Sequence, residues 1–177
     1  NNWLNGAWIM HQIERTYHQL CLNPGEGFGE AAGDLLEVLM LHLPYAARWI
    51  DAWRAAGEDT HSDILFEWTS LFETCLSHKD RDGWPAFLPL YEQMKTVPDL
   101  SPKALALIHM GEIMAGEIPI RELQGALDQL SSQIPDEPGP FHFAAILQFR
   151  HGDVEGARRA CRQALAIAPT YAPAHIL

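Results

Sequence analysis

The sequence predicts an all-α protein of about nine helices, and three observations lead to this prediction. Valine, a residue typical of strands, occurs at only three of 177 positions, and no segment alternates apolar and polar residues for long. Apolar residues instead recur at helical spacing, most clearly between Ile64 and Leu76 at offsets of 0, 1, 4, 7, 8, 11 and 12. Proline and glycine interrupt these runs at short intervals, which is typical of helices joined by short loops.

Each predicted helix is an apolar stripe that begins or ends near a helix-breaking residue. The helix that contains Ile64 follows Asp59 and Thr60, either of which can cap it, and it is followed by the polar segment 80–83. Because the loops are short, successive helices are expected to be antiparallel neighbours, in a bundle or in a stack of helical hairpins. In chain order the stripes occupy residues 3–20, 35–43, 45–53, 64–76, 84–94, 104–114, 120–134, 141–149 and 154–168.

Composition excludes several classes of function. The chain has 12 basic and 23 acidic residues, and a formal net charge of −11 argues against nucleic acid and anionic lipid as partners. No apolar run approaches the ~18 residues of a membrane span, so no membrane insertion is expected. Cys21, Cys75 and Cys161 are too scattered for a disulfide framework or a zinc motif. The sequence favours a cytoplasmic protein, and its first and last residues lead us to expect a fragment of a longer chain.

Residues 141–169 contain a pattern of small residues and breakers that indicates a helical hairpin. Ala145 is followed by Gly152 in the turn, by Ala157 and Ala164 on the second helix, and by Pro169 at the end. The alanines let the two helices approach closely, and Asp153 can cap the second helix. This segment resembles the tetratricopeptide repeat, whose unit is two antiparallel helices.

The resemblance extends to about residues 101–177. Gly116 precedes Gly152 by 36 residues and Pro135 precedes Pro169 by 34, so an upstream, more divergent repeat is expected. From Tyr171 onward the sequence is similar to the first helix of a third, truncated repeat. The resemblance implies a right-handed α-solenoid of antiparallel helical hairpins over residues 98–177. Residues 1–97 are then a divergent helical region, an N-terminal cap or a part that mediates dimerisation.

The family pattern also implies where a partner binds, because the first helices of such repeats line a concave groove. Some family members hold a C-terminal carboxylate there, and Ile146 and His142 replace the residues of that clamp here. The expected function is therefore binding of a peptide or a partner domain, with no cofactor and no catalysis, and a homo-oligomer is left open. The groove positions are Lys103, Ala106, Met110 and Met114 in the upstream unit and His142, Ile146, Phe149 and Arg150 in the downstream unit.

An alternative interpretation places a metal-binding or enzymatic helical bundle in residues 1–97. His11, Glu14 and His18 fall within about 60° of one another on an ideal helix, although Arg15 beside them disfavours a cation. In the second half of the chain, His109 and Glu112 share a face of the nearly all-apolar helix 104–114. A buried histidine that finds a backbone acceptor is the default interpretation there, and a general base is the alternative.

Overall fold

The computed structural model describes residues 6–23, 27–98, 100–171 and 174, and over these residues it contains helices and turns but no strand. The prediction of an all-α chain with about nine helices is confirmed for this part of the sequence. Trp3, where the first stripe was expected to begin, and most of the segment after Tyr171 lie outside the described residues. The helices are α1 (Gly6–Leu22), α2 (Phe28–Leu41), α3 (Ala46–Thr60), α4 (Asp63–Asp82), α5 (Leu88–Met94), α6 (Pro102–Ala115), α7 (Leu123–Gln133), α8 (Gly139–Arg150) and α9 (Val154–Ile167). Short 3-10 segments precede α3, α5 and α7, namely η2 (Leu43–Tyr45), η3 (Trp84–Phe87) and η4 (Ile120–Glu122).

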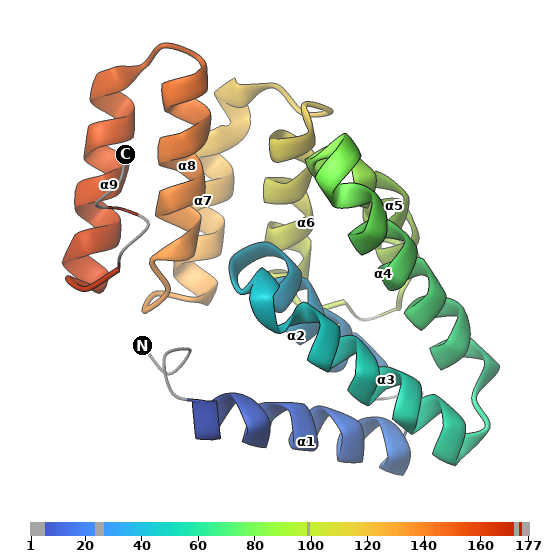
Figure 1. Cartoon of the computed structure of the whole chain (residues 1–177). Helices are drawn as coiled ribbons and strands as arrows, with labels where there is room; N and C mark the ends of the chain where they lie inside the picture. The colour runs from blue at the N-terminus through green and yellow to red at the C-terminus, as the bar shows by residue number, and fades with distance from the viewer. Residues whose placement is uncertain (1–5, 24–26, 99, 172–173, 175–177) are drawn as a thin grey trace.

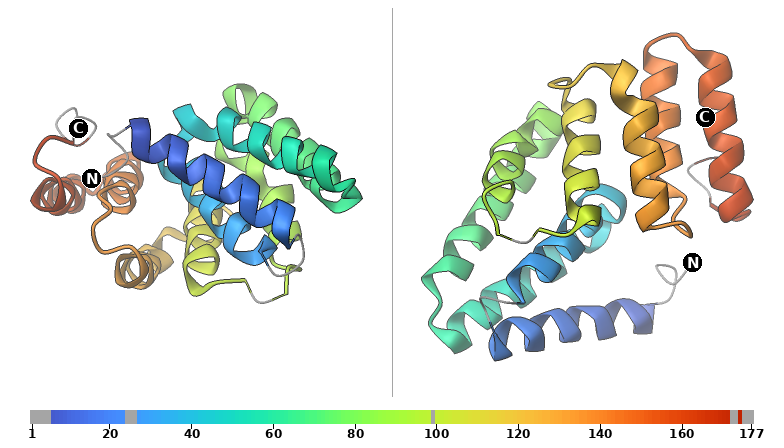
Figure 2. Two further views of the ribbon diagram at one scale, coloured as in Figure 1. Left: turned by 90° about the horizontal axis from the view of Figure 1, so that it is seen from below. Right: turned by 180° about the vertical axis from the view of Figure 1, so that it is seen from behind.

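The helices form two groups in space. Helices α6 to α9 lie side by side in chain order, and α1 to α5 form the second group (Figure 1). Helix α2 packs against α6 and thereby joins the two groups. Helix α1 packs mainly against α3 and only weakly against α2, its neighbour in sequence, and Figure 2 shows it on the outside of the first group of helices. The order of packing therefore departs from a simple succession of antiparallel neighbours in the first half of the chain.

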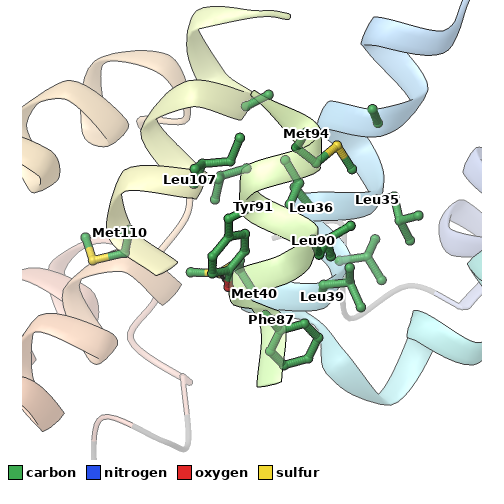
Figure 3. Close-up of a cluster of buried hydrophobic side chains, with 14 of the residues drawn as sticks. Leu35, Leu36, Leu39, Met40, Phe87, Leu90, Tyr91, Met94, Leu107 and Met110 are labelled. Atoms are coloured by element: carbon green, nitrogen blue, oxygen red, sulfur yellow. Dashed lines mark hydrogen bonds between the residues drawn. The ribbon is translucent and has the colours of Figure 1, made fainter. Parts of the chain in front are cut away.

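The core is built around α2 and α6, because these helices are apolar on nearly every side and have to be covered from several directions. Nine of the 14 residues of α2 are buried, and nine of the 14 residues of α6 are buried as well. Figure 3 shows the centre of this core, where Leu36 and Met40 of α2, Tyr91 of α5 and Leu107 of α6 lie close together. The Tyr91 hydroxyl donates a hydrogen bond to Met40 Sδ at 3.2 Å.

A second part of the core is aromatic and joins α2, α3 and α4. The ring of Trp53 contacts Phe28 at a centroid distance of 5.2 Å and Phe72 at 5.3 Å, edge to face in both cases. Trp68 packs against Phe28 and Phe72 in turn. Edge-to-face aromatic pairs are stabilising beyond the area that they bury. Trp49 is buried as well, and the partly buried Trp8 and Trp84 pack against the same core.

The hairpin of α8 and α9 has the local features that the sequence predicted. Ala145, Ala157 and Ala164 are buried, as the close contact between the two helices requires. Gly152 has φ +83°, a left-handed conformation that favours glycine in the turn between the helices. Asp153 caps α9, because its Oδ1 accepts a hydrogen bond from the backbone N–H of Gly156 at 2.8 Å. In the hairpin of α6 and α7, Gly116 has φ +86° at the equivalent position.

None of the described helices combines the length and the apolar character that crossing a membrane requires.

Candidate functional site

Half of the expected groove is covered by the chain itself. Ala106 and Met110 of α6 are fully buried, and Met114 is nearly so. Lys103 is held by α2, with its Nζ 2.8 Å from Asp34 Oδ1 and 2.9 Å from Glu37 Oε2. Burial alone would lower the pKa of Lys103, but the carboxylates of Glu37 and Asp34 raise it above its usual value, so the side chain stays charged.

A glycine lies where α2 packs on α6. A Cβ at Gly33 would lie 3.5 Å from Ala104 Cβ, which is an ordinary contact, and 3.2 Å from Ser101 Oγ, which would have to shift by a few tenths of an ångström. Ser101 is also the N-cap of α6, and its hydroxyl oxygen accepts a hydrogen bond from the backbone N–H of Ala104 at 3.2 Å. The surface of α6 near Lys103 is thus an internal helix–helix contact in this structure.

The groove positions on α8 are more accessible. Phe149 is 53% exposed, which is unusual for a large aromatic side chain, and Arg150 beside it is exposed as well. His142 and Ile146 are half-buried. The ring of His142 meets the ring of Tyr171 edge to face at 5.8 Å, and burial lowers the pKa of His142. The last turn of α8 therefore presents an aromatic and a cationic side chain to solvent.

Phe149 of α8 lines a cavity of about 460 Å³ whose other lining residues are on α9 and at Ala174. Apolar atoms form most of its wall, including the 44% exposed side chain of Val154. The guanidinium groups of Arg158 and Arg162 come from the same side of α9, one turn apart. We call this the α8–α9 pocket. It is lined by Phe149, Val154, Ala157, Arg158, Cys161, Arg162 and Ala174.

The charge of this hairpin contrasts with that of the whole chain. Helices α8 and α9 with their turn contain four arginines and two acidic residues, whereas the chain as a whole has a net charge of −11. Arg158 forms an ion pair with Glu155 at 2.8 Å, with both side chains exposed to solvent. An exposed pair of this kind contributes little stability and is readily exchanged for another carboxylate. The pocket thus combines an apolar wall with exchangeable cationic groups.

The expected metal ligands of α1 occupy an open surface. His11, Glu14 and His18 are exposed and line a cavity of about 670 Å³, together with Arg15 and the exposed side chain of Leu22. Arg15 forms an ion pair with Glu30 of α2. A guanidinium group inside the same cavity opposes the binding of a cation, as expected from the sequence.

A different set of potential metal ligands meets where α2 ends and α8 begins. Glu37 lies on α2, His42 directly follows this helix, and Glu137 precedes α8. One ligand atom from each of these residues lies within 4.8 Å of the others, and all three side chains are largely buried. Sequence reasoning missed this group because Glu137 is far from the other two along the chain, and no local spacing links them.

His109 and Glu112 do not act together in the described structure. Glu112 is buried and forms an ion pair with Lys95 at the end of α5, and this hydrogen bond raises the pKa of Lys95. His109 is half-buried on the same helix. The Glu112 carboxylate is therefore engaged in a contact between α5 and α6.

Comparisons of the chain with protein-family models, with curated proteins and with solved structures give no match. The functional interpretation consequently rests on the side chains, cavities and charges of this chain.

Proposed function

We propose that this chain is a protein-interaction module whose hairpins α6–α7 and α8–α9 are tetratricopeptide-like repeats of a right-handed α-solenoid. The proposal is supported by the small buried residues of the second hairpin and by the positive-φ glycines at equivalent turns. It is also supported by the side-by-side arrangement of α6 to α9 in chain order (Figure 1). Binding would be non-covalent recognition by a preformed surface.

The observation that carries the binding function is the exposed Phe149 at the edge of the α8–α9 pocket. Exposed aromatic side chains beside an apolar cavity are typical of protein-binding surfaces, where aromatic and arginine residues contribute most of the affinity. Because α2 binds Lys103 and the other expected groove positions of α6 are buried, we place the partner on the side of α8 and α9.

The chemistry of the pocket selects a class of partner. The apolar wall accommodates a side chain such as leucine or phenylalanine, and Arg158 and Arg162 attract carboxylates next to it. We therefore expect a peptide segment in which an apolar residue is flanked by glutamate or aspartate. The remaining acidic surface of the chain would repel such a peptide elsewhere, which favours one binding position.

Fluorescence anisotropy with labelled synthetic peptides tests this proposal. A peptide with leucine between glutamates should bind, while the same peptide with lysines in place of the glutamates should not. Phe149→Ala and Arg162→Glu should each weaken binding about tenfold or more, and added salt should weaken it further. Arg121→Glu is the matched control, because this arginine is exposed and belongs to η4.

A further pair of variants distinguishes binding in the α8–α9 pocket from binding on the concave side of α8. Arg150 was expected in the groove and does not line the pocket. If Arg150→Glu abolishes binding and Arg162→Glu leaves it unchanged, the pocket is the wrong site. If both peptides bind equally well, or if neither binds, the proposed partner class is refuted.

A further inference from the structure

We propose that Glu37, His42 and Glu137 bind one divalent transition-metal ion of the Zn²⁺ class, which ties the end of α2 to the start of α8. An imidazole nitrogen and two carboxylate oxygens are a donor set that Zn²⁺ accepts in proteins. The three donors come from two segments that the fold brings together. This site is independent of the peptide-binding surface on α8 and α9.

The distances are close to those that a tetrahedral ion requires. Ligands held at ~2.0–2.2 Å from a tetrahedral ion lie about 3.3–3.6 Å from one another. His42 Nε2 and Glu137 Oε2 are 3.4 Å apart, so this pair already has the required spacing. All three ligand atoms lie within 4.8 Å of one another, so Glu37 needs to approach by only about an ångström.

The surroundings hold two of the ligands in place. The second oxygen of Glu137 accepts a hydrogen bond from the backbone N–H of Gly139 at 3.2 Å, which orients the carboxylate. Gly139 has no side chain to keep the helices apart, and a Cβ at this position would lie 2.9 Å from Leu41 Cδ2. His42 follows Leu41, so the same close contact positions its imidazole against Glu137.

Charge also favours a bound cation. The exposed fractions of the side chains are 10% for His42, 8% for Glu137 and 13% for Glu37. Asp34 lies next to this group, and Lys103 is the cation that contacts both Asp34 and Glu37. The partner of Glu137 is the His42 imidazole, which is a cation only when it is protonated. A buried carboxylate is costly without a compensating charge, and a metal ion between these side chains would supply one. When Glu37 turns toward the ion, Lys103 retains Asp34 as its partner.

One of the three ligands borders a cavity. This cavity of about 180 Å³ opens onto Glu37 and is also lined by Trp8, Gln12, Arg15, Asp34, Trp49 and Lys103. An ion that enters there passes the cations of Arg15 and Lys103, which the carboxylates of Asp34 and Glu37 offset.

Isothermal titration of the full chain with zinc sulfate, after treatment with a chelator, tests the proposal. We expect one equivalent of Zn²⁺ to bind and the melting temperature to rise with zinc. His42→Gln and Glu137→Gln should each weaken binding about 100-fold or more, because each removes one of three ligands. The matched control is the double variant His11→Ala with His18→Ala, which removes two exposed histidines of α1 and should bind zinc unchanged.

Binding of Co²⁺ to the wild-type chain is a second test. It needs no variant, so its result does not depend on whether the variants fold. Bound to the wild-type chain, Co²⁺ in a site with one imidazole and two carboxylates should give the intense visible absorption of tetrahedral coordination, and zinc should displace it. Absence of stoichiometric zinc binding overturns the proposal and leaves His42 and Glu137 as an ion pair only. Loss of binding in the His11 and His18 double variant overturns it as well, because the ion would then be held by α1.

Discussion

Replacing Gly111 by alanine tests how closely α5 packs against α6. Gly111 lies in the middle of α6 and faces the ring of Tyr91, and a Cβ at this position would lie 2.5 Å from Tyr91 Oη and 2.6 Å from Cε2. The ring cannot move into solvent, because Tyr91 is only 1% exposed and its hydroxyl is bonded to Met40. The added methyl group therefore has to displace core side chains.

Two opposing effects determine the change in the free energy of unfolding. Overpacking a buried site costs about 1–3 kcal/mol. Alanine stabilises a helix interior relative to glycine by about 0.5–1 kcal/mol, which offsets part of this cost. We therefore expect Gly111→Ala to destabilise the protein by about 1–2 kcal/mol.

Gly125 of α7 is the matched control, since it also lies within a helix but a Cβ there meets nothing within 4 Å. Gly125→Ala should stabilise the protein by about 0.5–1 kcal/mol. Urea unfolding followed by circular dichroism measures both changes in free energy, and in thermal unfolding the two melting temperatures should differ by roughly 5 °C or more. If Gly111→Ala is as stable as Gly125→Ala, the packing of Tyr91 against α6 is not as described.

Two further predictions concern the second hairpin. Asp153→Ala removes the cap of α9 and should lower the free energy of unfolding by about 0.5–2 kcal/mol in urea titrations, whereas Asp136→Ala, at an exposed loop position, should change it little. Burial lowers the pKa of His142 in the folded protein. As the pH falls through about 6.5, the ordinary pKa of histidine, His142 therefore becomes protonated in the unfolded chain before it does so in the folded protein. Wild type should therefore lose stability relative to His142→Phe between about pH 7.5 and about pH 5, and equal pH dependence of the two proteins would contradict the burial of this imidazole.

The features that the sequence predicted correctly are local. Helical stripes, turn glycines and the Asp153 cap depend on residues a few positions apart, and the turn glycines and this cap were found where the pattern placed them. The prediction that Asp59 or Thr60 caps the helix of Ile64 is wrong, because α3 continues to Thr60 and Ser62 is the N-cap of α4. Helix α2 begins at Phe28, seven residues before the predicted stripe 35–43. The apolar character of residues 104–114 also indicated correctly that this helix is buried. Short-range geometry of this kind can be derived from spacing, because the helix repeat fixes which residues share a face.

The sequence alone could not predict the long-range contacts that bury Lys103, bring Glu137 to its partners and form the α8–α9 pocket. Lys103 has the family position of a groove residue, yet Asp34 and Glu37 of α2 bind it. Glu137 gave no signal of its own, because its partners on and after α2 are about a hundred residues away in the chain. Phe149 was expected on the concave side of α8, but only the structure showed that it borders a cavity with Arg158 and Arg162.

By itself, therefore, the amino-acid sequence determined that the chain is helical, roughly which segments form its helices, and which hairpin packs through alanines. The tertiary structure alone decided that α2 lies on α6, that α1 pairs with α3, and that two glutamates and a histidine meet at one junction. The physical reason is that an apolar helix has to be buried, but its apolar residues do not determine which other helix packs against it. The choice among partners depends on the shape and charge of segments far apart in the chain, such as Gly33 against Ala104 and Lys103 against Asp34.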